Sequence, residues 1–286
     1  MNIIEFAEKY NVFYNAVKGS YEHGVELQQY EKDFLNNLSE NRFTIDLQSR
    51  QMNITTLLSV YASYNLIYGN DDRTIYLANK IDMGYHFNEL VRNILYHYCE
   101  ANELSYEKMC NINNKNKIEI NDNILIVRSA TPDAFRGMTV NRILIDQAAF
   151  IEPLERMFSA MMCVTSIKDS QIHMVSTPNS SNFFQSLYVC DNVFKKSKYH
   201  YSLNPKRFTP ENLEAIKRSI GYDSDMWGQE MEMEFISYKS GKGRNLQVRV
   251  DEETYYKLIA RIHELGVNTS DYIRNLIEKD LQNLKS

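Results

Sequence analysis

The sequence predicts an α/β fold with a mainly parallel sheet. Four strand candidates recur along the chain, at 41–47, 73–79, 142–146 and 171–177, and the last two are apolar, β-branched runs of the kind buried in parallel sheets. Helical patterns lie between them, over 57–69 and around 82–101. Strands that alternate with helices predict a sheet that helices cover on both faces.

Four further segments extend this large domain. Residues 2–18 and 25–38 carry apolar side chains at helical spacing, which predicts a helix in each. The runs KIEIN at 117–121 and NILIVRS at 123–129 predict two short strands around a tight turn at Asn121–Asp122. We therefore expect one large α/β domain over residues 1–237.

Composition bounds the class of protein. Of the 286 residues, 43% are hydrophobic and 24% are charged, which is typical of an ordinary soluble globular protein. No apolar run approaches the roughly 18–20 residues that span a bilayer, and the N-terminus lacks a signal-peptide pattern. We therefore expect a cytoplasmic protein without a membrane partner. Widely spaced cysteines without a CxxC pair predict reduced thiols and no metal site: Cys99, Cys110, Cys163 and Cys190.

The charge is unevenly distributed. The net charge is −5, yet residues 238–286 hold nine basic and seven acidic residues, against 23 and 30 in residues 1–237. The small, polar, glycine-bearing stretch 238–244 predicts a linker between the large domain and a second one at 245–286. If nucleic acid is a partner, this sign difference favours contact through the tail.

Residues 49–56 read SRQMNITT, directly after a predicted strand and at the start of a predicted helix. Phosphate-binding loops occupy this position, where backbone N–H groups surround phosphate oxygens, a lysine reaches the β and γ phosphates, and a hydroxyl binds magnesium. Here Asn53 and Ile54 stand in place of the glycine and the lysine of such a loop. In the same way, RILIDQAAF at 142–150 has the pattern of a magnesium-binding strand without its glutamate.

The order of motifs resembles the ATPase domain of the large terminase subunit, the motor that packs DNA into tailed-phage heads. The resemblance covers about residues 1–237 and rests on six segments: LQQYEKDFL, SRQMNITT, SATPDAFRG, RILIDQAAFIEP, VSTPNSSNFF and WGQEMEMEF. It implies a P-loop NTPase-like fold. It also implies a nucleotide site in which Arg50, Gln51, Thr55, Thr56, Asp146 and the coupling-motif residue Thr177 match the family, beside an adenine contact at Tyr30.

The sequence departs from the family at positions whose side chains take part in ATP binding and hydrolysis. Asn53 and Ile54 replace the loop's glycine and lysine, Gln147 replaces the glutamate that polarises water, and Glu31 stands where the family has glutamine after Tyr30. Losing one such charged group typically costs about a hundred- to a thousand-fold in rate. We expect a pseudo-ATPase that binds ATP and magnesium weakly or not at all. The alternative is that another lysine enters the site, although the only cation in the loop itself is Arg50.

Residues 245–284 resemble a ribbon–helix–helix module, in which strands of two chains pair and enter the DNA major groove. The run 245–251 alternates strictly, and helical patterns follow over 252–265 and 268–284. One face of the run would pair in the dimer ribbon: Leu246, Val248 and Val250. The remaining polar residues are expected DNA contacts: Asn245, Gln247 and Arg249 to bases, and Lys242, Arg244, Thr269 and Ser270 to phosphates. The alternative is a solvated strand and hairpin that cap the large domain.

Three functions are compatible with these patterns. The first is a non-catalytic DNA-binding protein that interferes with or redirects phage genome packaging in a bacterial host cell, with double-stranded DNA, a second copy of itself and packaging proteins as partners. The second is an active packaging ATPase with an unusual loop, against which Ile54 and Gln147 argue. The third is a ribbon–helix–helix transcriptional regulator whose large domain is an interaction platform.

Overall fold

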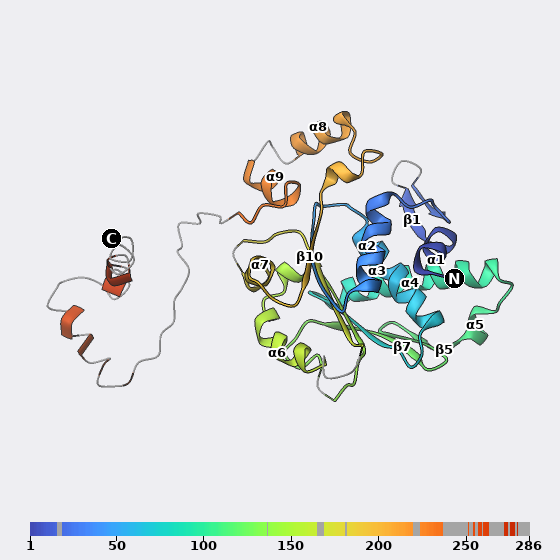
Figure 1. The fold of residues 1–286 in the computed structure, drawn as a ribbon, viewed down its shortest axis with the longest axis horizontal. Coiled ribbons are helices and arrows are strands. Elements are labelled where there is room, and N and C mark those ends of the chain that lie inside the picture. Colours follow the sequence, from blue (N-terminus) through green and yellow to red (C-terminus); the bar gives the residue numbers. More distant parts are fainter. Residues whose placement is uncertain are drawn as a thin grey trace. The chain divides into compact units, whose positions relative to one another are not determined.

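The computed structural model describes residues 1–236 except 16–18, 136, 165–168, 181 and 220–223, together with scattered positions between 251 and 279 (Figure 1). The chain divides into two compact units, Met1–Tyr238 and Lys239–Ser286. Among the described residues, no helix is long and apolar enough to cross a membrane.

An eight-stranded sheet forms the centre of the first unit, in the order β10-β3-β9-β8-β4-β7-β6-β5. Six neighbouring strands are parallel: β3 (Phe43–Gln48), β4 (Arg73–Ala78), β7 (Asn123–Ser129), β8 (Arg142–Asp146), β9 (Gln171–Ser176) and β10 (Lys195–Tyr199). Two antiparallel pairings extend one edge, through β5 (Cys110–Asn114) and β6 (Lys117–Ile120). The predicted α/β fold with a mainly parallel sheet is confirmed.

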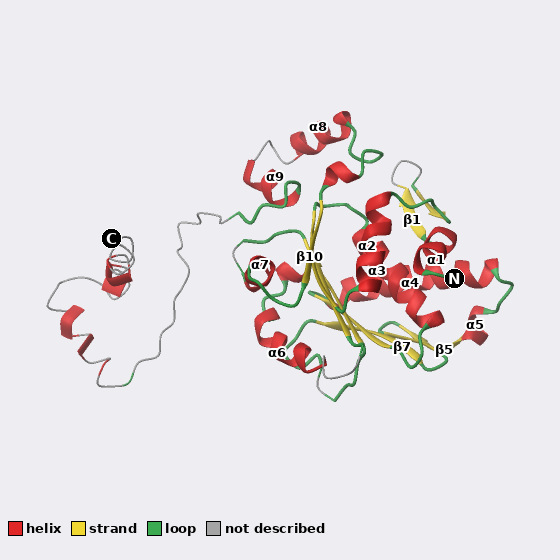
Figure 2. Cartoon of the chain, in the orientation of Figure 1, coloured by secondary structure: helices red, strands yellow, loops and turns green. Residues whose placement is uncertain are grey.

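Helices cover both faces of the sheet (Figure 2). One face packs against α1 (Ile3–Tyr10), α2 (Gln29–Glu40), α3 (Ile54–Tyr68) and α4 (Ile81–Ala101) in one apolar core. The other face packs against α6 (Leu154–Val164) and α7 (Phe183–Val189) in a second core. Shorter elements complete the unit: α5 (Tyr106–Met109), η1 (Ala148–Phe150), η2 (Tyr201–Leu203), α8 (Pro210–Ser219) and α9 (Ser224–Glu230).

The prediction of one helix over residues 2–18 is wrong. The helix ends at Tyr10, and Val12–Asn15 (β1) pairs antiparallel with Ser20–His23 (β2). Asn11 causes the change, because its side chain receives a hydrogen bond from the N–H of Val25 at 2.8 Å and donates one to the carbonyl of Val25 at 2.6 Å. These bonds hold the chain in an extended conformation after the helix, where an aromatic and β-branched run favours a strand.

Strand β3 carries a buried carboxyl group. Asp46 has no exposed surface, and its Oδ1 atom accepts a hydrogen bond from Asn37 of α2 at 3.1 Å. Its Oδ2 atom has no hydrogen-bond partner among the described residues. Burial raises the pKa of Asp46 to about 7, because a charge without water or a counterion is costly.

This carboxyl group predicts a pH-dependent stability. An unfolded aspartate titrates near pH 4, so between about pH 4 and pH 7 the folded chain binds more protons at Asp46 than the unfolded chain. The free energy of unfolding therefore falls as the pH rises through this range. Asp46→Asn should stabilise the protein about 2–3 kcal/mol more at pH 8 than at pH 5. Urea unfolding of both proteins at the two pH values measures the difference.

Asp33→Asn is the matched control, because Asp33 is an exposed carboxylate on the same helix as Asn37. It should change stability by a similar small amount at both pH values. An equal gain from Asp46→Asn at pH 5 and pH 8 would contradict the assigned titration.

Candidate functional site

The loop between β3 and α3 turns through two left-handed residues. Gln51 has φ 65° and Asn53 has φ 58°, and α3 begins at Ile54. Asparagine adopts this conformation more readily than most residues other than glycine, so the turn forms without the glycine of a phosphate-binding loop. The Asn53 side chain makes no capping hydrogen bond to the first turn of α3. The first N–H groups of a 15-residue helix therefore lack a side-chain cap.

A cavity of 290 Å³ lies at this loop, and we call it the loop pocket. Gln48, the last residue of β3, is only 5% exposed, and its side chain has no hydrogen-bond partner among the described residues. Its amide therefore remains available to a ligand in the pocket. The residues that line the pocket are Gln48, Gln51, Met52, Asn53, Ile54, Thr55, Thr56, Gln147 and Arg207.

Ile54 supplies no charge to the loop pocket. It is 2% exposed and belongs to the apolar core beneath α3. Arg50, the cation that the sequence places in the loop, is directed elsewhere: its guanidinium Nη1 lies 3.1 Å from Glu230 Oε2, and its N–H donates to the Glu230 carbonyl at 2.7 Å.

Arg207 is a functional candidate that the sequence reasoning missed. Its Nη2 atom donates a hydrogen bond to Gln51 Oε1 at 2.9 Å, which brings a guanidinium group to the loop. It lies in the segment after η2, far from the loop in sequence. A loop motif gives no indication of such a residue, because the pairing of β10 with β3 brings the segment close.

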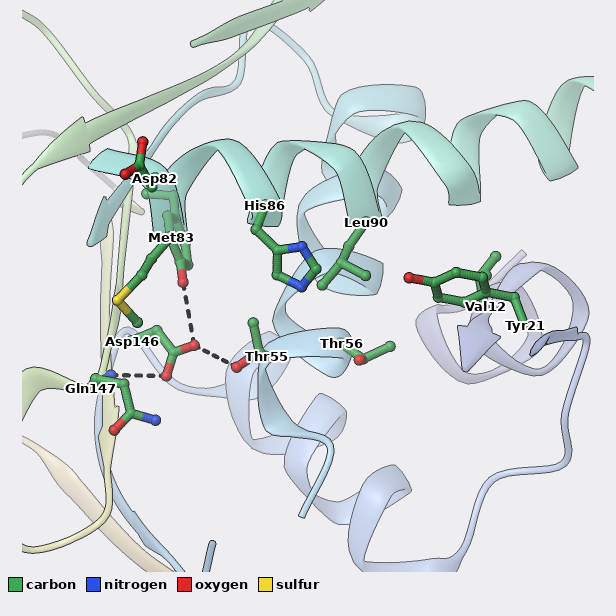
Figure 3. Close-up of a pocket in the computed structure, with 11 residues that line it drawn as sticks. Val12, Tyr21, Thr55, Thr56, Asp82, Met83, His86, Leu90, Asp146 and Gln147 are labelled. Atoms are coloured by element: carbon green, nitrogen blue, oxygen red, sulfur yellow. Dashed lines mark hydrogen bonds between the residues drawn. The ribbon is translucent and has the colours of Figure 1, made fainter. Parts of the chain in front are cut away.

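Thr55 and Asp146, which the sequence resemblance matches to magnesium-binding positions, are hydrogen bonded to each other. Thr55 Oγ1 donates to Asp146 Oδ2 at 2.6 Å, and Tyr76 OH donates to the same oxygen at 3.2 Å. The N–H of Gln147 donates to Asp146 Oδ1 at 2.8 Å (Figure 3). Burial raises the pKa of Asp146, and the three donors oppose that rise. Tyr76 was not expected here from the sequence.

Tyr30 and Glu31 bind each other rather than facing an open site. Tyr30 OH lies 3.0 Å from Glu31 Oε1 and 3.3 Å from the Met52 carbonyl in the loop. Glu31 Oε2 accepts a hydrogen bond from the N–H of Gln28 at 2.8 Å, and Asn204 donates to Tyr30 OH at 3.1 Å. Burial raises the pKa of Glu31. Both carboxylate oxygens of Glu31 are therefore already engaged.

A second hollow, of 690 Å³, shares Thr55, Thr56 and Gln147 with the loop pocket. Asp146 and Gln147 lie at one end of it, and Val12 and Tyr21 of the hairpin lie at the other (Figure 3). The remaining residues come mainly from the start of α4: Tyr76, Asp82, Met83, His86 and Leu90. In the described part of the chain, no group of three or more His, Cys, Asp or Glu residues is placed to hold a metal ion.

The other expected site residues lie outside the two hollows or outside the described residues. Thr177 follows β9 and is buried, but it lines neither hollow. The expected DNA and ribbon residues all lie outside the described residues: Lys242, Arg244, Asn245, Leu246, Gln247, Val248, Arg249, Val250, Thr269 and Ser270. The positions described from Thr254 to Lys279 are helical, and the N–H of Thr254 donates to Asp251 Oδ1 at 2.8 Å.

Solved structures of phage large terminases resemble this chain in fold. The ATPase domain of the Thermus phage P74-26 large terminase matches with a TM-score of 0.54 at 16% identity, over 74% of this chain and 95% of that domain. The HK97 bacteriophage large terminase matches with a TM-score of 0.61 at 13% identity, over 81% of this chain and 54% of its own. The large terminase of a thermophilic bacteriophage, in complex with ADP, matches with a TM-score of 0.56 at 11% identity.

The last match covers 73% of this chain and 53% of that terminase. The present chain thus spans about half the length of the full terminases, but nearly all of the isolated ATPase domain. No known family profile matches the sequence. The large unit therefore has the fold of a phage large-terminase ATPase domain, as the sequence resemblance implied.

Proposed function

We propose that this protein is a non-catalytic, DNA-binding relative of the packaging motor that interferes with or redirects genome packaging by a tailed phage. One observation carries the proposal: Ile54, which the sequence resemblance matches to the lysine of a packaging ATPase, is buried in the apolar core beneath α3. Gln147 stands beside Asp146 where the motor family has a glutamate. A carboxamide does not accept a proton from water at neutral pH, so the group that would activate the attacking water is missing.

The surroundings of the loop also oppose nucleotide binding. Glu31 replaces a glutamine that offers both a donor and an acceptor, and a carboxylate offers acceptors only. Its oxygens are already hydrogen bonded to Tyr30 and Gln28, which leaves little for an adenine. Magnesium would have Thr55 and Asp146 as ligands, since these two side chains are already together. Without a lysine on the phosphates, however, that pair alone binds a magnesium nucleotide weakly.

We predict no ATP hydrolysis. In a phosphate-release assay the purified protein, with or without DNA, should match the buffer, because the lysine and the glutamate are both replaced. Turnover that disappears in Asp146→Ala would overturn the pseudo-ATPase assignment. Turnover that persists in Asp146→Ala would reveal a contaminating enzyme.

The tail supplies the proposed DNA contact. Residues 245–251 alternate between polar and apolar side chains, and two such strands from two chains would form a ribbon with an apolar inner face. The basic residues of the linker, Lys242 and Arg244, precede this strand and suit phosphate contacts. A module of about forty residues buries little core by itself, which favours a dimer.

We predict that the full chain is a dimer that binds duplex DNA sequence-selectively. Arg249→Ala should cost about 1–3 kcal/mol at the preferred site and relax selectivity there, because a bidentate base contact is lost. Electrophoretic mobility shifts against a selected site and a scrambled one measure this effect.

Two controls separate base reading from charge. Lys242→Ala should weaken binding to both DNA sequences alike and lower the salt slope, because phosphate contacts carry no base information. A chain that ends at Ser237 should lose both dimerisation, by light scattering, and DNA binding. Unchanged selectivity in Arg249→Ala would mean that the ribbon does not read the bases.

The link to packaging follows from the combination of the two units. A terminase-like body without the lysine and the glutamate of a motor lacks the groups needed to translocate DNA by that family's mechanism. It retains the shape of a motor subunit, so it can present a motor-like surface to the partners of a terminase. The tail can also occupy a packaging-start sequence. Both routes compete with the phage's own machinery by mass action, so the effect should rise with the amount of protein.

We predict that expression of the protein in a phage-infected host lowers the number of filled heads that carry the phage genome, while replication and late transcripts stay near normal. Quantitative PCR of nuclease-protected DNA, of total phage DNA and of late mRNA separates the three steps. Arg249→Ala should lose the effect. A fall in late transcripts before any change in filled heads would instead identify a transcriptional repressor.

A further inference from the structure

We propose that the loop pocket still binds a phosphate-type oxyanion, without magnesium, and that Arg207 supplies the cation that Ile54 cannot. The inference concerns the same loop as the proposed function but requires no hydrolysis. Neither Arg207 nor Gln48 belongs to the loop motif SRQMNITT, so the two proposed side-chain contacts come from outside it.

The backbone of the pocket suits an anion. The left-handed residues Gln51 and Asn53 curve the loop into the start of α3, whose first N–H groups have no side-chain cap. The N-terminus of a helix carries a partial positive charge and points its free N–H groups at a ligand. A helix terminus alone does not make a site, and two side chains supply the rest.

Gln48 is the first of these side chains. It is 95% buried, since only 5% of its surface is exposed, and it lines the pocket. Its amide forms no hydrogen bond with any described residue. The amide faces the cavity, so a ligand there can receive its hydrogen bonds without breaking any that it already makes. The NH₂ group of Gln48 is a suitable donor to a phosphate oxygen.

Arg207 is the second, and its backbone is held in place before any ligand binds. The N–H of Arg207 donates to Asn204 Oδ1 at 3.2 Å, and Asn204 is itself buried. The same Asn204 side chain bonds Tyr30 OH at 3.1 Å and receives a bond from Gln28 Nε2 at 2.9 Å. A buried network that reaches α2 therefore fixes the turn from which Arg207 extends.

The charge of Arg207 is also unneutralised. Its described partner, Gln51 Oε1, is a neutral amide oxygen, and no described carboxylate pairs with it. Arg50 differs, because Glu230 already neutralises it. A guanidinium group binds phosphate through paired N–H donors, and such charge-assisted bonds are stronger than neutral ones. Arg207 is thus a cation beside the loop that is available to an anion.

The size of the pocket favours a small ligand. Its volume of 290 Å³ is at the lower limit of small-molecule pockets, which run from about 300 to 1,000 Å³. Beside it, Tyr30 and Glu31 are engaged with each other. The pocket therefore suits phosphate or pyrophosphate, either free or carried on a nucleotide whose base adds little.

The test is calorimetric titration of the full chain with pyrophosphate, in EDTA and at constant ionic strength. We expect saturable binding at one site. Arg207→Gln should weaken it about ten- to a hundred-fold, the loss of one charge-assisted contact. Arg218→Gln is the matched control, an arginine on α8 that pairs with Glu214 and does not line the pocket, and it should bind like the parent.

Gln48→Met gives an independent check, because it keeps the volume of the side chain and removes only the amide. It should weaken binding several-fold while the thermal melt of the free protein stays at or above that of the parent. Equal affinity of the parent and Arg207→Gln, or no saturable binding by the parent, overturns the proposal. Neither result affects the packaging experiment, and ATP turnover would overturn the proposed function without touching this one.

A final titration with ADP, again without magnesium, identifies the source of the phosphate. Binding no tighter than that of pyrophosphate supports a free anion. Binding more than tenfold tighter that is still lost in Arg207→Gln would confirm Arg207 as the cation of the site, and it would overturn the weak nucleotide binding proposed above. ADP binding that ignores Arg207→Gln, together with no pyrophosphate binding, overturns the assignment of Arg207.

Discussion

The hydroxyl of Ser49 is the contact on which the arrangement of the site depends. It has no exposed surface, accepts a hydrogen bond from the N–H of Tyr201 at 2.9 Å and donates one to the carbonyl of Met231 at 2.5 Å. The N–H of Ser49 donates to Tyr199 at 3.0 Å, which continues the pairing of β3 with β10. Through this residue the loop is joined to both ends of residues 199–231, and the bonds of Arg50 to Glu230 reinforce the second of these joints. Arg207 lies between those ends, so its position at the loop follows from the same contact.

The groups that the fold needs differ from those that hydrolysis needs. Thr55 and Asp146 bond each other directly and so connect α3 to β8, which gives them a structural role without any ligand. Ile54 adds to the core under α3, and burying such a side chain stabilises a protein by about 1.5–3 kcal/mol. A lysine in its place would need water or an anion for its charge. The isoleucine therefore favours stability at the position that the sequence resemblance matches to a lysine, and residues that serve activity often cost stability.

The sequence predicts the strands that are apolar and buried, because a run of apolar, β-branched side chains is itself typical of a buried strand. Strands β4, β8 and β9 are of this kind, and their bounds lie within a residue of the expected runs. Strand β10 carries three lysines on the edge of the sheet. Its residue pattern is therefore typical of a solvent-exposed segment and does not predict a strand. Residues 12–15 keep helical spacing, yet the two hydrogen bonds of Asn11 to Val25 override it. The spacing of apolar residues within a segment does not predict such long-range hydrogen bonds.

Because local sequence patterns do not predict long-range contacts, only part of the candidate site could be predicted from the sequence. Motif matching finds Thr55, Asp146 and the replaced positions, because each lies at a fixed offset from a strand end. Three other residues have roles that depend on contacts with distant parts of the chain: Gln48, Tyr76 and Arg207. Arg207 is 156 residues from its partner Gln51. A lysine within the loop would move with the loop, whereas Arg207 reaches the pocket only while its segment stays attached, through Ser49 and through the bonds of Asn204 to Tyr30 and Gln28. Anion binding in this chain would therefore depend on that attachment, and a bound anion would strengthen it in return.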